Sequence, residues 1–166
     1  MPKEDEVKNV AVADGVVTTI KEIPQKLIVQ RLQENAVLPA FATDGSMCFD
    51  LHAVEPGSVT VYSGLAYTFS TGLAFQIPEG YGMEIYGRSG LGFANGVRLS
   101  NCTACIDGDY RKEVKIRLHN DSCEPYTVLP GERIAQARLV KLVPTDLVEG
   151  VVEATGRGGF GSTGKL

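Results

Sequence analysis

The sequence predicts an all-β barrel or sandwich with at most one short helix. Short runs that alternate apolar and polar residues recur along most of the chain, as half-buried strands do. Turn signals built on glycine and proline separate these runs at residues 55–57, 77–80 and 129–131. No window keeps a helical apolar stripe over several turns. Many short strands joined by such turns are typical of barrels and sandwiches.

The elements follow in order from the N-terminus. Residues 1–25 mix both charges with small residues and valines, so we expect an extension with weak structure of its own. The expected strands cover residues 26–32, 58–62, 66–69, 73–77, 82–86, 113–118 and 134–143. After Glu153 the chain is rich in glycine and has too little apolar surface to fold alone. We therefore predict an N-terminal extension (1–25), a β domain (26–150) and a flexible C-terminal arm (151–166).

Composition limits the classes of function. The 166 residues are 43% hydrophobic and 22% charged, which is ordinary for a globular protein with one core. The net charge of -4 argues against a protein that coats nucleic acid. No run approaches the ~18 apolar residues of a membrane span, and the charged start does not resemble a secretory signal. We expect a protein that is not secreted and that is cytoplasmic, or inside a host cell if the gene is viral.

The cysteines raise the question of a metal site. Cys102 and Cys105 have the spacing of zinc ligands, but Cys48 and Cys123 stand alone and provide no second pair. We therefore expect buried thiols in strands.

Two segments carry residues suited to chemistry. Residues 106–111 (IDGDYR) hold two carboxylates, a tyrosine and an arginine, which can orient water or metal, although Asp-Gly is ordinarily a turn signal. Residues 158–164 (GGFGSTG) let backbone N–H groups approach an anion, although composition alone fits a plain flexible tail. Phe160 favours a binding role, because a ring in a polar arm has no core to join and can stack on a base.

Two further segments are weaker signals. Residues 87–91 (GRSGL) follow an expected strand and can hold phosphate, or can form a simple connecting loop. Residues 131–136 (GERIAQ) can face a ligand or merely solvate a strand.

Together these segments resemble the sequence motifs of the trimeric dUTPase family. Residues 45–53 (GSMCFDLHA) are similar to the first motif, 87–91 to the second, 105–111 to the third, 131–136 to the fourth and 158–164 to the fifth. The resemblance covers residues 26–166. It implies a jelly-roll-like barrel, a homotrimer with active sites between subunits, and hydrolysis of dUTP to dUMP and pyrophosphate with Mg2+. From the net charge and the lack of a long apolar run, we expect no nucleic-acid or membrane partner.

The resemblance also implies roles for residues at matching positions. Asp107 would be the general base that orients the attacking water, and Tyr110 would pack against deoxyribose. The hairpin from Asn101 to Asp107 would read uracil. Ser89 would contact the phosphate chain with Arg88 supporting its loop, and Gln136 would hold phosphate or the ordered water. Arg157, Ser162 and Thr163 would reach the phosphates from the arm, and Phe160 would stack over uracil. Gly90 and Gly161 would also be substrate-binding positions. No direct protein ligand to the metal is expected, and Asp50 would support the metal region indirectly.

The chain departs from the family pattern at several positions. Thr155 stands where the fifth motif usually has arginine, and Arg157 lies closer to Phe160. Ala104 replaces a hairpin glycine, which would alter uracil binding if that position needed a positive φ. The other changes are Met47, Cys48, Gly87 and Lys112. They indicate a divergent member, and we take a viral or phage-borne gene as a working guess.

Two alternatives stay open. The first is a dCTP deaminase, or a bifunctional deaminase and pyrophosphatase, on the same fold. The second is a regulatory module that binds nucleotide without turnover. We expect Arg111 and Arg133 to form structural ion pairs and leave them out of the catalytic set.

Overall fold

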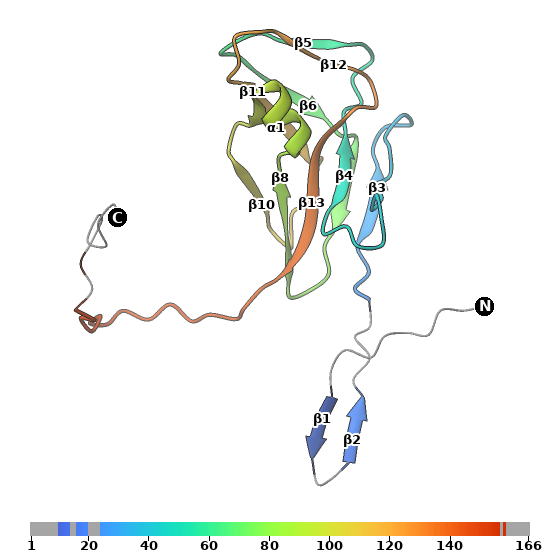
Figure 1. The fold of residues 1–166 in the computed structure, drawn as a ribbon. Coiled ribbons are helices and arrows are strands. Elements are labelled where there is room, and N and C mark those ends of the chain that lie inside the picture. Colours follow the sequence, from blue (N-terminus) through green and yellow to red (C-terminus); the bar gives the residue numbers. More distant parts are fainter. Residues whose placement is uncertain (1–9, 14–15, 20–23, 157, 159–166) are drawn as a thin grey trace.

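A computed structural model describes residues 10–13, 16–19, 24–156 and 158 of the chain. These residues form a β barrel with one helix, α1 (Ser89–Asn95), as the sequence predicts (Figure 1). The strands are β1 (Val10–Ala13), β2 (Val16–Thr19), β3 (Ile28–Arg31), β4 (Phe49–His52), β5 (Val59–Val61), β6 (Ala66–Ser70), β7 (Leu73–Gln76), β8 (Tyr81–Tyr86), β9 (Val97–Leu99), β10 (Thr103–Ile106), β11 (Lys115–Asn120), β12 (Tyr126–Val128) and β13 (Arg133–Lys141). Within the described part of the chain, no helix is long and apolar enough to cross a membrane.

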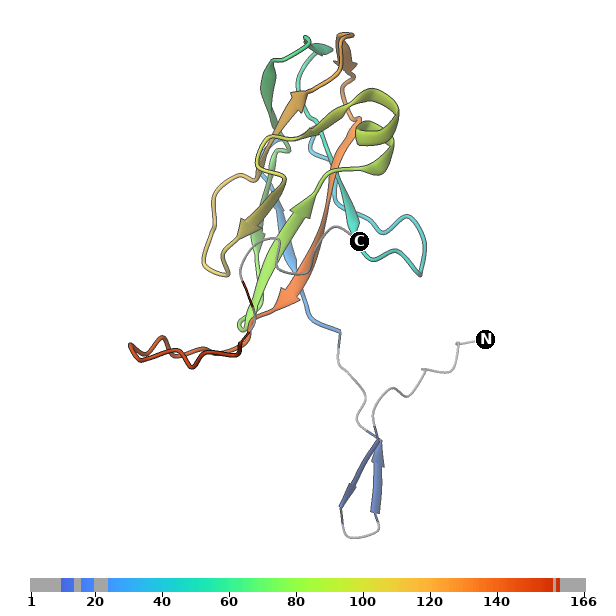
Figure 2. The same ribbon diagram turned by 60° about the vertical axis from the view of Figure 1, so that its left-hand side comes forward.

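Short antiparallel sheets surround one core. The largest sheet has the order β10-β8-β13-β4, and β6-β11-β9, β12-β5 and β3-β7 complete the barrel (Figure 2). Alternate residues of each strand face the core, because side chains in a strand point to opposite sides. On β13, Ile134, Ala135 and Ala137 are buried while Gln136 and Arg138 face outward. The register shift between Arg133 and Ala135 sets this pattern and so determines which polar groups reach the outer face.

All seven expected strands of the β domain coincide with observed strands, with ends that differ by a few residues. The sequence did not indicate β4, β9, β10 or β12. Each of these strands is three or four residues long, but so are β3, β5 and β7, which the sequence did indicate, so strand length alone does not separate the two groups.

The N-terminal extension contains more structure than we expected. Strands β1 and β2 pair antiparallel from Val10↔Thr19 to Ala13↔Val16, and neither pairs with another described strand. The sequence contained the signal for this hairpin, because valine-rich runs flank the turn dipeptide Asp14-Gly15.

The expectation of buried thiols in strands is wrong for all four cysteines, and Cys48 lies just before β4 rather than in it. Cys102, Cys105 and Cys123 are exposed, and Cys48 is half-buried. Cys105 lies in β10, but this is an edge strand and the residue points to its outer face. Cys102 lies in a turn with φ 59°, and Cys123 lies in the loop after β11. Among the described residues no group of three or more His, Cys, Asp and Glu side chains could hold a metal ion.

Candidate active site

A polar cavity of about 330 Å³ lies where the N-terminus of α1 meets β4 and β13. It collects residues from three motifs that are far apart in the sequence. The lining residues are Ala42, Ser46, Met47, Cys48, Asp50, Arg88, Ser89, Gly90, Arg133 and Gln136. The structure therefore brings together five of the residues singled out in the sequence: Asp50, Arg88, Ser89, Gly90 and Gln136.

Asp50 organises the charges of this cavity. Arg88 Nε donates to Asp50 Oδ1 at 3.2 Å, and Arg133 Nη1 donates to Asp50 Oδ2 at 3.2 Å. Arg88 Nη1 also donates to the Arg133 carbonyl at 3.1 Å, which closes the network. The Asp50 side chain is only 15% exposed, so its charge requires these partners. Two guanidinium groups and one carboxylate leave a positive excess that suits a phosphate chain.

Gln136 connects the fourth motif to the second. Its side chain lies on the outer face of β13, in register with Asp50 on β4 and Tyr86 on β8. The Gln136 Nε2 donates to the Gly87 carbonyl at 2.9 Å and so holds the loop that leads to Ser89. Its Oε1 is left to accept a hydrogen bond from water or ligand.

The cavity also contains residues that sequence reasoning missed. The expected ion pair of Arg133 is confirmed by its contact with Asp50, but Arg133 lines the cavity as well and is 49% exposed. Its place in the fourth motif was the available signal. Cys48 also lines the cavity, and burial raises the pKa of its thiol despite the opposing charge of Arg138. The neutral thiol is therefore favoured beside the polar side chains of the cavity.

The third-motif residues lie at the other end of the same sheet. Strand β10 runs antiparallel to β8, with Thr103 opposite Tyr86 and Ile106 opposite Met83. Asp107 comes after β10 and therefore lies near the first residue of β8. Arg88 lies just beyond the last residue of β8, at the opposite end. At ~3.3 Å per residue, roughly 15–20 Å separates them. One chain does not bring Asp107 and Tyr110 to the polar cavity.

The loop that carries Asp107 is braced by its own hydrogen bonds. Tyr110 N–H donates to the Asp107 carbonyl at 3.1 Å, and the Tyr110 hydroxyl donates to the Glu113 carbonyl at 3.0 Å. Arg111 Nη1 donates to the Gly108 carbonyl at 2.7 Å, so this residue supports the loop through carbonyl groups, and it forms no ion pair of the kind we expected with any residue in the described part of the chain. A Cβ at Gly108 would lie 2.9 Å from the Tyr81 carbonyl, so the loop rests directly on β8. The Asp107 carboxylate is exposed on this rigid support.

The hairpin from Asn101 to Asp107 tolerates alanine at position 104. Ala104 lies within β10 and packs partly against the core, and among the described residues other than glycine only Cys102 has a positive φ. Replacing a glycine by Ala104 therefore introduces no backbone strain. Asn101 is exposed in the turn, where its carbonyl accepts from the Thr103 N–H at 2.6 Å.

The predicted arm residues Arg157, Phe160, Gly161, Ser162 and Thr163 lie outside the described residues. The chain that leads toward them leaves the barrel after β13, at the Asp107 end of the sheet (Figure 1). This segment is apolar yet exposed, with Leu147 at 95% and Val151 at 98%. Such side chains gain nothing from their own barrel and are suited to contact another surface.

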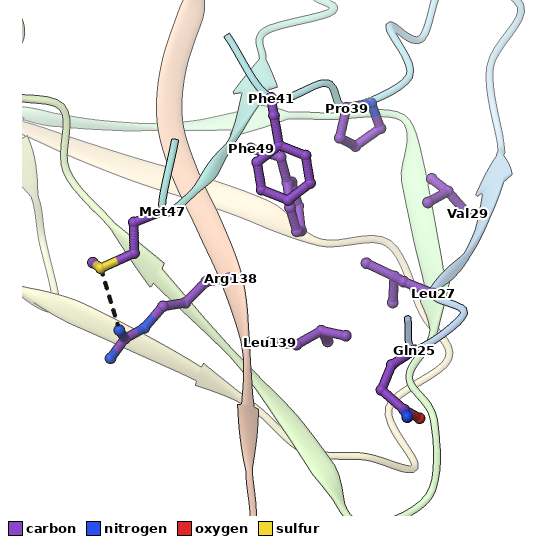
Figure 3. Close-up of a pocket in the computed structure, with 9 residues that line it drawn as sticks. All are labelled: Gln25, Leu27, Val29, Pro39, Phe41, Met47, Phe49, Arg138 and Leu139. Carbon is purple, nitrogen blue, oxygen red and sulfur yellow. Dashed lines mark hydrogen bonds between the residues drawn. The ribbon is translucent and has the colours of Figure 1, made fainter. Parts of the chain in front are cut away.

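A wider groove beside β3 differs in character from the polar cavity. It measures about 540 Å³ and is lined by Gln25, Leu27, Val29, Pro39, Phe41, Met47, Phe49, Arg138 and Leu139 (Figure 3). Its charged group, Arg138, is directed along one wall, where Nη1 donates to the Met47 sulfur at 3.5 Å. The groove therefore suits apolar side chains rather than phosphates.

Comparison with known proteins gives the family. The dUTPase family profile matches residues 34–164, and the chain belongs to this family. A deoxyuridine 5'-triphosphate nucleotidohydrolase from Nautilia profundicola is 42% identical over 144 residues, which cover 84% of this chain and 99% of the relative. The enzyme of the same name from Neisseria meningitidis serogroup B is 40% identical, over 86% of this chain and 97% of the relative.

Solved structures agree with the fold. A point variant of the dUTPase from phage 80alpha superposes with a TM-score of 0.75 at 24% identity, covering 84% of this chain and 99% of the other. A point variant of the dUTPase from phage phi11 of S. aureus, described with a structural Mg(II) ion, gives a TM-score of 0.69 at 22% identity, over 80% of this chain and 100% of the other. At these identities the likeness shows the barrel fold alone.

Proposed function

We propose that this protein hydrolyses dUTP to dUMP and pyrophosphate. The observation that carries the proposal is the cavity in which Arg88, Ser89 and Gln136 converge around the Asp50–Arg88–Arg133 network. Its positive excess fits a triphosphate chain, and the family membership of the chain gives the reaction class. Removal of dUTP would limit uracil incorporation into DNA, and the product dUMP would be available for dTMP synthesis.

In this proposal the chemistry divides between the cavity and the Asp107 loop. Ser89, Gly90 and the arginine network hold the phosphates, and Gln136 Oε1 helps to fix the attacking water. Asp107 orients that water toward the α-phosphorus, which is largely a matter of placement, because phosphoryl transfer depends on positioning and charge stabilisation. Tyr110 packs on the deoxyribose, and the hairpin from Asn101 reads uracil through its backbone. Arg157, Phe160, Gly161, Ser162 and Thr163 close over the nucleotide.

Magnesium would be held chiefly by the substrate phosphates and water. Both Asp50 carboxylate oxygens accept hydrogen bonds from arginine side chains. This carboxylate is therefore suited to hold the two guanidinium groups in place rather than to ligate a metal. Magnesium keeps several waters and commonly binds through phosphates, which fits a cavity of this kind. When bound, the ion would neutralise charge on the phosphate chain.

The complete site would be shared between subunits of a homotrimer. The distance between Asp107 and Arg88 along the sheet supports this, since the two ends of β8 cannot meet in one chain. The exposed apolar segment after Lys141 and the apolar groove beside β3 also support assembly, because both leave apolar surface uncovered in a single chain.

Pyrophosphate release from dUTP, dCTP, dTTP and UTP, with and without magnesium, tests the proposed reaction. We expect rapid magnesium-dependent release from dUTP alone. Cytosine presents a reversed donor pattern to the hairpin, and the 2′-hydroxyl of UTP would meet Tyr110. Ammonia released from dCTP would instead favour the deaminase. Tight dUTP binding without release would favour a regulatory binding module.

Mixed trimers test the shared site. We expect Arg88→Ala and Asp107→Asn proteins each to be nearly inactive, and their co-refolded mixture to recover about a quarter of the wild-type activity. If each site takes its cavity from one chain and Asp107 from the next, a site is intact when an Asp107→Asn chain supplies the cavity and an Arg88→Ala chain supplies Asp107. Each variant refolded alone is the control. A mixture as inactive as its components would mean that the two groups act within one chain.

A further inference from the structure

His52 stands next to the charge network of the cavity but has no role in the mechanism above. It follows Asp50 by two residues on β4, so both side chains lie on the outer face of the strand. In the register of the sheet, His52 is directly opposite Arg133 on β13. Its imidazole therefore lies beside the carboxylate that holds Arg88 and Arg133.

The imidazole is placed as a neutral group. Its Nδ1 is buried and has no hydrogen-bond partner among the residues that the structure describes. The charged groups that face it are Asp50 on its own strand, Arg133 on β13 and Arg88 in the loop after β8. Burial lowers the pKa of His52, and although Asp50 opposes the shift, both arginines add to it. The neutral form thus persists below the ordinary value near 6.5.

Protonation would change this arrangement in a definite way. A charged imidazole needs an acceptor for its buried Nδ1–H, because a buried charge without a partner is costly. Of the three charged groups that face it, only Asp50 can accept, and both of its oxygens already bind arginine. A third cation would therefore compete with Arg88 and Arg133 for one carboxylate.

We propose that His52 is a positioning residue whose neutral imidazole keeps Asp50 committed to Arg88 and Arg133, and that its protonation releases these arginines from their phosphate-binding positions. The proposal deepens the proposed function and rests on it, because the arginines matter as phosphate ligands. Its effect falls on substrate affinity, since Arg88 and Arg133 would contact the phosphates, whereas Asp107 would orient the attacking water.

Two substitutions separate this role from simple packing. His52→Lys places a permanent cation beside Asp50, whereas His52→Gln keeps a neutral polar side chain. At pH 7.5 we expect the KM for dUTP of His52→Lys to exceed that of His52→Gln by about tenfold, with similar kcat. In the wild type, kcat/KM should fall by about tenfold per pH unit below the His52 titration, and this acid limb should move to lower pH in His52→Gln. Equal KM values for the two variants, or an unmoved acid limb, would overturn the proposal.

An NMR titration gives a readout that does not depend on turnover. The chain has two histidines, so the His52 signal is identified by its loss in His52→Gln. We expect the Nε–Hε signals of Arg88 and Arg133 to shift with the His52 midpoint in the wild type and to stay still in His52→Gln. Static arginine signals would overturn the inference even if dUTP is hydrolysed. Moving signals in a protein without dUTP hydrolysis would support the network and refute the proposed function instead.

Discussion

Replacing Asp107 with asparagine should lower the rate of dUTP hydrolysis by about 10²–10⁴-fold, the usual contribution of a positioned general base. The side chain is exposed on a loop whose backbone is fixed by Tyr110, Arg111 and the close contact between Gly108 and Tyr81. An amide fits the same space but cannot take a proton from water. Binding of a non-hydrolysable dUTP analogue should therefore change little, and calorimetry beside a pyrophosphate assay measures both quantities.

Asp109 provides the matched control for this experiment. It lies two residues further along the same loop and is also exposed, so Asp109→Asn makes an equal change of charge. We expect this variant to keep most of its turnover. An Asp107→Asn enzyme with near-normal kcat would show that another group orients the water.

Deleting residues 156–166 should reduce kcat/KM for dUTP by about 10²-fold or more, in the range lost when a closing segment and its positioning contacts are removed. The segment contains Phe160 and the donors Ser162 and Thr163, which would cover the base and phosphates. The buried core ends within β13, so the melting temperature of the barrel should stay close to that of the full chain.

Substitutions within the arm refine this second prediction. A full-length Phe160→Ala protein lacks the ring that would stack on uracil and should be little more active than the truncated protein. Phe160→Tyr keeps the ring and should have most of the wild-type activity. A truncated protein with full turnover would mean that closure by the arm is unnecessary. A truncation that also lowers the melting temperature by many degrees would assign the segment a role in assembly instead.

The sequence predicted the fold well where strands are long. β8 and β13 have six and nine residues, so their alternation is visible. Strands of four residues were predicted only in part, since β3 and β7 were expected whereas β4 and β10 were not. The hairpin of β1 and β2 was not predicted because its strands pair only with each other among the described strands, so no apolar face packed on the barrel marks them in the sequence. The cysteines were misjudged because exposure depends on whether a strand is central or at an edge, and sequence alone does not give that order.

The candidate site was predicted as a set of residues and not as a geometry. Motif order pointed to Asp50, Ser89 and Gln136, and the structure places all three around one cavity. The hydrogen bond from Gln136 to Gly87 and the double pairing of Asp50 depend on strand register, which no spacing in the sequence reveals. The same holds for Asp107, whose distance from the cavity follows from the antiparallel pairing of β10 with β8.

The uncovered apolar segment after β13 affects how the protein is made in the cell. All of the barrel strands precede Leu142, so the ribosome completes them before Leu147, Val148, Val151 and Val152 emerge. The barrel core can form without these side chains, which then stay exposed on the folded chain until they contact another surface. The time for which this apolar segment stays exposed then depends on how soon a chain assembles with other subunits. When few chains are present, binding by chaperones is favoured over assembly.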